Sequence, residues 1–116
     1  MPRAKGGYKT RRRRKKWLEV TKGFRGSPNN VYRLARQAAE RALAHSYRGR
    51  KQKKRDYRRL WIIRVNAALE SEGVSYNRFM YLLKEKNIDI NRKMLAELAI
   101  NDNEAFKLLV KKVNQS

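Results

Sequence analysis

The sequence predicts an all-α protein with two unlike parts: a long basic N-terminal helical extension, followed by a small globular helical bundle. Positive charge is concentrated in residues 1–64, which hold 23 Lys and Arg against three acids, whereas residues 65–116 hold eight against seven. Apolar side chains recur at helical spacing from residue 61 onward, and no stretch alternates in the manner of a strand. We therefore assign residues 1–59 to the extension and residues 60–116 to the globular domain.

The first half of the chain carries nearly all of the charge excess. The whole chain of 116 residues has a formal net charge of +21, of which +20 falls within residues 1–64. Like charges at this density repel one another and oppose compaction unless a polyanion offsets them. We interpret the first half as a segment that lies against phosphate, with a solvated tail or a targeting signal as the plain alternative.

Length and composition exclude several other classes. A domain of about 50 residues buries only about 60% of the surface that its unfolded chain exposes, which leaves no room for a large enzyme cleft. The absence of Cys fits a reducing compartment. No apolar run approaches the ~18 residues of a membrane span, and the N-terminus lacks the apolar block of a signal peptide. We expect a soluble, cytoplasmic protein with no membrane partner.

Residues 1–30 form an arm that we expect to be disordered or only locally helical until it binds. Six consecutive cations, Arg11–Lys16, lie among glycines, and their repulsion and backbone entropy exceed any burial available. Gly23 and Gly26 bracket two residues, which fits a flexible joint and a tight turn pressed against phosphate equally well.

One long helix is predicted over residues 30–72. Ser27 followed by Pro28 is a helix-start signal, and either of the two asparagines that follow would cap equally well. No Pro interrupts the segment, Gly49 marks a predicted bend, and Gly73 ends the helix. At about 1.5 Å per residue, such a helix is roughly 60 Å long.

The middle of this helix, residues 48–60, has cations on all sides. Lys54/Arg58 and Arg55/Arg59 are pairs four residues apart, and each like-charge pair opposes the helix by about a few tenths of a kcal/mol in water. A bound polyanion would reverse the sign of that effect. We expect this segment to stiffen on binding.

The remaining residues have the spacing of helices that pack into one core. The end of the long helix presents an apolar stripe at Trp61, Ile62, Val65, Ala68 and Leu69. A second helix is predicted over residues 75–86, a third is capped by Asn91, and a fourth opens with a capping box of Asn101 and Glu104. The residues predicted to face the stripe are Phe79, Leu82, Leu83, Leu95, Leu98, Ala99, Phe106, Leu109, Val110 and Val113.

No catalytic constellation is found in the sequence. His45 is the only histidine and has no second ligand or base partner of its own kind, so a helix surface position or a phosphate hydrogen bond explains it better than catalysis. The acids of the second half are spread over the polar faces of separate helices. We predict no enzyme activity, no metal site, no cofactor and no small-molecule substrate.

Aromatic residues are interleaved with the cations, which makes the nucleic-acid signal more specific than charge alone. Flat rings stack on exposed bases while Lys and Arg neutralise the backbone. Trp17 is the better stacking candidate, because it lies in a segment without a core. For Tyr57 and Trp61, one turn apart at the entrance to the bundle, core packing is favoured and base stacking remains the alternative.

Five segments carry a resemblance to a known family. They are the opening MPRAK, the turn KGFRGS, the block YRGRKQKKRDYRRLWIIRVNAA, and the segments GVSYNRFMYLLK and NRKMLAELA. In this order, and across essentially the whole chain, they resemble the bacterial large-subunit ribosomal protein L-twenty family. The most specific part is residues 54–68. Glu70 departs from the pattern, because the family usually has a basic residue there, and this argues against a phosphate contact from that turn.

The resemblance implies a basic helical extension that threads among helices of large-subunit ribosomal RNA, and a small C-terminal domain that recognises an RNA junction. It also implies an early role in assembly of the large subunit and, in some members, repression of translation of their own messenger RNA. The implied partners are large-subunit ribosomal RNA and neighbouring proteins of the L-thirteen and L-twenty-one families. The implied location is the ribosome in the cytoplasm.

The predicted RNA-facing residues come from two sources. By similarity to the family they are Lys5, Lys15, Lys16, Lys22, Gly23, Gly26, Arg33, Arg48, Arg50, Lys54, Arg55, Arg58, Arg64 and Lys93. The pattern of cations and aromatics adds Arg11, Arg12, Arg13, Trp17, Arg25, Arg36, Lys51 and Arg92. Around the predicted cap Asn91, a phosphate site at a helix N-terminus and a plain surface cap are equally open interpretations.

Two other classes stay open on composition. A DNA-binding architectural protein would bind duplex DNA as tightly as structured RNA, and it would carry an even basic face on the folded domain as well as on the tail. A cationic membrane-surface peptide is disfavoured, because cations on all sides of residues 48–59 leave no wide apolar face.

Binding of structured RNA is expected to raise the helical content of residues 1–59, because a polyanion removes the repulsion that opposes helix formation there. Circular dichroism of the full-length chain, with the RNA signal subtracted, measures this change. Unchanged helicity on binding would contradict coupled folding.

Overall fold

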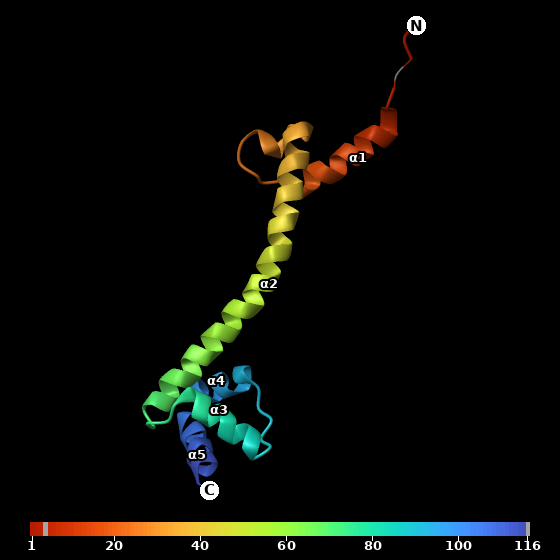
Figure 1. The fold of residues 1–116 in the computed structure, drawn as a ribbon. Helices are drawn as coiled ribbons and strands as arrows, with labels where there is room; N and C mark the ends of the chain where they lie inside the picture. The colour runs from red at the N-terminus through yellow and green to blue at the C-terminus, as the bar shows by residue number, and fades with distance from the viewer. Residues whose placement is uncertain (4, 116) are drawn as a thin grey trace. The chain divides into compact units, whose positions relative to one another are not determined.

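The computed structural model describes residues 1–3 and 5–115 of the chain. Within these residues it contains helices and no strand, which confirms the all-helical class. The elements, in chain order, are α1 (Gly7–Val20), the short 3-10 helix η1 (Ser27–Asn29), α2 (Tyr32–Glu70), α3 (Tyr76–Glu85), α4 (Arg92–Asn101) and α5 (Asn103–Asn114) (Figure 1).

The chain divides into two compact units, residues 1–51 and residues 52–116. The first contains α1, η1 and the first part of α2, and the second contains the rest of α2 with α3, α4 and α5. The long basic helix and the helical bundle that the sequence predicts are therefore both present. Over the described part of the chain, no helix is long and apolar enough to cross a membrane.

Helix α1 makes the N-terminal arm locally helical, one of the two states expected for it. Lys and Arg are good helix formers, so their intrinsic preference favours a helix even where their charges repel. Gly6 precedes α1 with φ of 97°, a left-handed conformation that favours glycine. Just past the other end, the buried Thr21 donates its hydroxyl to the carbonyl oxygens of Trp17 and Leu18, at 3.4 and 3.3 Å.

Helix α2 begins and ends two residues inside the predicted bounds. The Ser27 and Pro28 signal starts the short η1 instead, and α2 begins at Tyr32. Its helical hydrogen bonding continues through Gly49. At the C-terminal end, Gly73 has φ of 68°, and the N–H groups of Gly73 and Val74 donate to carbonyls of the last turn at 3.2 and 3.3 Å. This arrangement is a Schellman motif, which satisfies carbonyls that the helix leaves unpaired.

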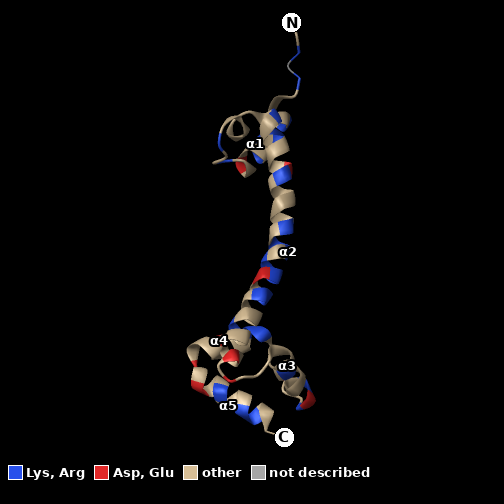
Figure 2. Ribbon diagram, turned by 60° about the vertical axis from the view of Figure 1, so that its left-hand side comes forward, with Lys and Arg blue, Asp and Glu red and all other residues tan. Residues whose placement is uncertain are grey.

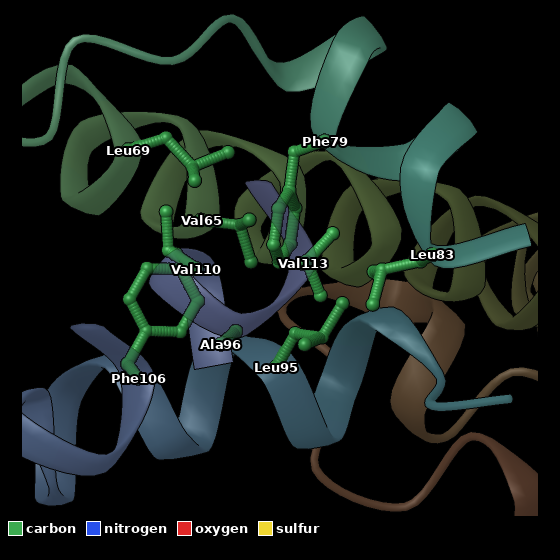
Figure 3. Close-up of a cluster of buried hydrophobic side chains, with 9 residues drawn as sticks. All are labelled: Val65, Leu69, Phe79, Leu83, Leu95, Ala96, Phe106, Val110 and Val113. Atoms are coloured by element: carbon green, nitrogen blue, oxygen red, sulfur yellow. The ribbon is translucent and has the colours of Figure 1, made fainter. Parts of the chain in front are cut away.

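The core of the second unit lies among the end of α2 and the three short helices, where Figure 3 shows the buried side chains pointing toward one another. The rings of Phe79 and Phe106 pack with their centroids 6.0 Å apart. The predicted apolar stripes are confirmed except at Ile62, which does not pack against the cluster, and Ala96 is an addition, because its side chain is only 1% exposed. The buried cluster consists of Val65, Leu69, Phe79, Leu83, Leu95, Ala96, Phe106, Val110 and Val113.

Two helix caps in this unit test the predicted start signals. The Asn91 cap of α4 is confirmed, since its side chain accepts a hydrogen bond from the backbone N–H of Met94 at 2.8 Å. The capping box at Asn101 is wrong: Asn101 is the last residue of α4, and Asp102 caps α5 by accepting from the N–H of Ala105 at 3.0 Å. Helix α4 continues one residue further than expected, which moves the cap one residue along.

Replacement of Leu95 by Ala is expected to lower the free energy of unfolding by about 2–5 kcal/mol, because Leu95 is fully buried and its truncation leaves a cavity. The matched control is Leu108→Ala, whose side chain is 66% exposed and whose removal should change stability by less than about 0.5 kcal/mol. Urea denaturation followed by circular dichroism compares the two variants. Equal losses of stability would show that the cluster is not the core that holds the bundle.

Candidate nucleic-acid interface

Helix α1 exposes cations on every side. The six consecutive residues Arg11–Lys16 are all exposed, and each step along a helix turns the side chain by about 100°, so the run surrounds the helix axis. An open groove on α1 is lined by Tyr8 and several of these cations, with Glu19 as its single acid. The ring of Tyr8 is 74% exposed. This surface offers phosphate partners and a ring that can stack on a base.

Trp17 does not lie in a segment without a core, and that expectation is wrong. The guanidinium of Arg36, on α2, lies over the Trp17 ring at 5.8 Å from its centroid, and that of Arg14 lies over Tyr32 at 5.3 Å. Trp17 itself is half-buried. Thr21, Ala35 and Ala39 are fully buried, so the first unit has a small core of its own. The predicted RNA-facing residues Trp17 and Arg36 thus contact each other.

Arg36 has a second partner on its own helix. Its Nε donates to Glu40 at 3.2 Å, and this hydrogen bond, together with Tyr32, raises the pKa of Arg36 above its ordinary value. Arg36 is therefore positively charged at neutral pH, as arginine side chains are in general.

The two glycines after α1 adopt turn conformations. Gly23 and Gly26 have φ of 90° and 77°, in the left-handed region that favours glycine. The N–H of Gly23 donates to the side-chain oxygen of Asn29 at 3.1 Å, and Phe24 donates to the carbonyl of Thr21 at 3.0 Å. The structure therefore has a defined turn at Gly23 and Gly26 and not a flexible joint. The N–H of Gly23 makes its hydrogen bond within that turn.

The middle of α2 carries exposed cations and aromatics. In the first unit, Lys51 lies over the ring of Tyr47 at 4.9 Å, and Arg50 donates to Ser46. In the second, Lys53 lies over the ring of Tyr57 at 6.0 Å. All side chains from residues 43 to 60 are exposed, including the predicted RNA-facing residues Arg48, Arg50, Lys51, Lys54, Arg55 and Arg58.

Tyr57 and Trp61 have different environments. Their ring centroids are 6.1 Å apart, yet Trp61 packs against the core while Tyr57 is 47% exposed. Core packing therefore holds for Trp61 and is wrong for Tyr57. The reason is geometric: residue 57 lies one turn before the point where the bundle begins to cover α2.

Few of these cations have an acidic partner. Among the described residues, the two ion pairs within 4.0 Å are Arg36–Glu40 and Lys107–Glu72. None of the cations between residues 41 and 64 takes part in either pair. Their charge is therefore available to an external anion, and no internal carboxylate must be displaced before a phosphate binds.

Helices α2 and α4 together line an open groove in the second unit. Arg64 and Lys93 are both exposed and line it, and so does the partly buried ring of Trp61. Arg92 lies differently, because it is half-buried and its Nε donates to the hydroxyl of Tyr76 at 2.8 Å. At the N-terminus of α4 the Asn91 side chain makes a helix cap, as the interpretation of Asn91 as a surface cap requires.

Several residues of this surface are absent from the sequence-based prediction. Some are exposed cations with the same charge signal as their neighbours, namely Lys9, Arg14, Arg41, Lys53 and Arg59. Others are Glu97 and Asn101, which line the groove beside Trp61. No sequence pattern identifies those two, because only the packing of α4 against α2 brings them to the tryptophan.

The described residues contain no group of three or more His, Cys, Asp and Glu side chains close enough together to hold a metal ion. His45, the only histidine of the chain, is exposed on α2. The polar surface of the described residues is dominated by Lys and Arg, which Figure 2 shows in blue along α1 and α2.

The fold and its surface define a class of protein: a basic, all-helical protein whose described residues expose many cations and form no metal site. Comparison with known proteins identifies the family. Residues 3–109 match the family described as ribosomal protein L20. The chain belongs to this family of structural, non-enzymatic proteins of the large ribosomal subunit. The resemblance drawn from the sequence segments, the expected absence of enzyme activity and the location on the ribosome are thereby confirmed.

Individual relatives cover nearly the full chain. The large ribosomal subunit protein bL20 of Natranaerobius thermophilus is 52% identical over 110 residues, which are 95% of this chain and 94% of the relative. The protein of the same name from Methylibium petroleiphilum is 55% identical over 113 residues, 97% of this chain and 96% of the relative. That from Mesoplasma florum is 51% identical over 116 residues, 100% of this chain and 97% of the relative.

Replacement of Lys54 by Glu is expected to stabilise the free helix, because the repulsion between Lys54 and Arg58 four residues later becomes an attraction. The gain at low salt should be about 0.5 kcal/mol, and it should disappear near ~1 M salt, where charges are screened. Helical content from circular dichroism, without RNA, measures it. Lys54→Gln is the matched control and should give about half the gain; a decrease in helicity with Lys54→Glu would show that cation repulsion does not limit α2.

Proposed function

We propose that this chain binds large-subunit ribosomal RNA and promotes early assembly of the large subunit. The observation that carries the proposal is the charge of the first 64 residues, which hold 23 Lys and Arg but only three acids. Two ion pairs are found among the described residues, and Arg36 is the one cation of this region that belongs to either of them. Cations that are exposed and lack acidic partners gain most when they neutralise phosphates and release bound counterions.

The proposed mechanism is non-enzymatic. Residues 1–59 would neutralise phosphates that otherwise keep RNA helices apart, and the near-neutral bundle would supply placement through shape, because a long-range field does not distinguish one RNA site from another. The RNA-facing residues that we propose are Lys5, Arg11, Arg12, Arg13, Lys15, Lys16, Trp17, Lys22, Gly23, Arg25, Gly26, Arg33, Arg36, Arg48, Arg50, Lys51, Lys54, Arg55, Arg58, Arg64, Arg92 and Lys93.

Further partners belong to the same proposal. Neighbouring large-subunit proteins, of the L-thirteen and L-twenty-one families, would contact the chain within the subunit. A messenger RNA of its own that presents the same folded feature as the ribosomal RNA would compete for the bundle, and binding there would repress translation. Crosslinking in cell lysate followed by sequencing of the attached nucleic acid tests both RNA partners, and large-subunit ribosomal RNA should dominate the reads.

The affinity of the full-length chain for a large-subunit ribosomal RNA fragment is expected to fall by about 10³ to 10⁵ between 50 and 200 mM salt, for about 6 to 10 phosphate contacts. Filter binding at several salt concentrations measures this slope. A triple variant, Lys54→Gln, Arg55→Gln and Arg58→Gln, should reduce the slope by about three, one for each phosphate that the variant no longer neutralises.

The matched control removes three exposed cations from outside the proposed interface, Lys84, Lys111 and Lys112, and should leave the slope unchanged. A duplex DNA of equal length serves as the second control. Equal slopes for the two triple variants would contradict the proposed interface. Equal affinity for DNA and structured RNA at matched salt would favour a DNA-binding architectural protein instead.

A further inference from the structure

The groove between α2 and α4 combines chemical groups that a phosphate-binding surface does not need. Its volume is about 440 Å³, within the range of roughly 300–1,000 Å³ that small-molecule sites occupy. From α2 it is lined by Trp61 and Arg64, one helical turn apart. The facing side chains all come from one side of α4, where they follow the i, i+3, i+4, i+7, i+8 spacing of one helix face: Lys93, Ala96, Glu97, Ile100 and Asn101.

Glu97 places a carboxylate among the cations of this groove, as Glu19 does in the groove on α1, but here the neighbouring ring is the partly buried Trp61 and not the exposed Tyr8. Glu97 lines the groove beside the cations Arg64 and Lys93, and Lys93 lies four residues before it on the same helix. Glu97 nevertheless takes part in neither of the two ion pairs found among the described residues. Its oxygens can therefore accept hydrogen bonds from another molecule, and the two cations keep their charge for an anion.

Trp61 supplies the apolar surface of the groove. The ring is partly buried, packs against the core of the bundle and also lines the groove. A ring held in place by a core loses little entropy when a flat molecule stacks on it. All four bases can stack on an aromatic side chain, because each has a flat π-face. Ala96 and Ile100 extend the apolar surface from the α4 side.

We propose that this groove binds a single unpaired nucleotide of RNA, with its base on Trp61 and its phosphates at Arg64 and Lys93. A paired nucleotide does not fit this description, because its base face is stacked within the duplex and its Watson–Crick edge is occupied. A free phosphate would use only the two cations and would leave the Trp61 ring and the Glu97 carboxylate without a partner. The proposal rests on the proposed function and assigns part of its specificity to one groove.

Glu97 also selects among the bases. A carboxylate only accepts hydrogen bonds, so it pairs with an edge that presents N–H groups. Guanine presents two adjacent N–H donors, at N1 and N2, whereas the single N–H of uracil lies between two carbonyl oxygens that a carboxylate repels. Asn101 adds an amide that both donates and accepts. The groove is therefore specific for guanine over uracil.

The test uses RNA hairpins that are identical except for one unpaired nucleotide in the stem, either guanine or uracil, and a fully paired hairpin. The full-length chain carries Trp17→Phe in every sample, which leaves Trp61 as its only tryptophan, since the sequence has two. At saturating RNA, the unpaired guanine should quench the Trp61 fluorescence more than the paired stem does. Its affinity should exceed that of the uracil hairpin by about 10-fold.

Glu97→Gln should reduce this preference for guanine to no more than about two-fold, because the amide no longer repels the uracil carbonyls. The matched control is Glu85→Gln, an exposed acid on α3 of the same bundle that does not line the groove. It should leave the preference unchanged. Arg64→Gln should weaken binding of both unpaired hairpins alike, because phosphate contacts carry no base preference.

Equal quenching by the paired and the unpaired hairpins, or a guanine preference that survives Glu97→Gln, would overturn this proposal. Either result leaves the proposed function standing if the affinity for ribosomal RNA still falls steeply with salt. A chain that shows no preference for structured RNA over duplex DNA and no salt dependence fails at the proposed function itself.

Discussion

Repulsion among the exposed cations of α2 is the constraint on which the rest of the structure depends. No side chain between residues 43 and 60 is buried, so this stretch gains little stability from apolar packing. The helix is held by burial outside that stretch, at Ala35 and Ala39 in one unit and at Val65 and Leu69 in the other. Burial in both units therefore keeps residues 43–60 helical although repulsion among their cations opposes the helix. A bound polyanion would replace that repulsion with attraction.

The two units differ in charge and packing, and the proposed function assigns them different parts of recognition. The first has cations on all sides of α1 and a few buried residues, Thr21, Ala35 and Ala39, and hydrogen bonds within it hold the turn that contains Gly23. Its charge attracts any polyanion and discriminates little. The second is nearly neutral and well packed, and it carries a groove in which a ring, two cations and a carboxylate lie together. In the proposed function, affinity would come mainly from the first arrangement, and selectivity from the second.

The fold could be predicted from the sequence because each of its signals is local. The apolar spacing from Trp61 to Leu69, the Asn91 cap and the glycine that ends α2 each depend on residues within one or two turns. The predicted helix ends at Asn101 and Ser27 are misplaced by a few residues, whereas the errors about side-chain surroundings arise where a contact between distant segments decides the outcome. The sequence of residues 1–30 does not reveal that Arg36 covers Trp17.

The same distinction explains the candidate site. Exposed cations could be predicted from charge alone, and those between residues 43 and 60 of α2 are all on the surface as expected. The partners of Trp61 could not, since Glu97 lies 36 positions later and reaches the ring only when α4 packs on α2. The charge pattern of a sequence does not show which acids form ion pairs, because that depends on which side chains the fold brings together.

Asp102 ends α4 and also caps α5, and this double role has a consequence for how the chain can vary in length. There is no spare residue at this corner to absorb an insertion. One added residue after Asp102 would rotate α5 by about 100° about its own axis and carry Phe106 out of the core. Length variation must therefore be accommodated elsewhere, for example between α3 and α4, where residues 86–91 connect the helices without such a shared residue.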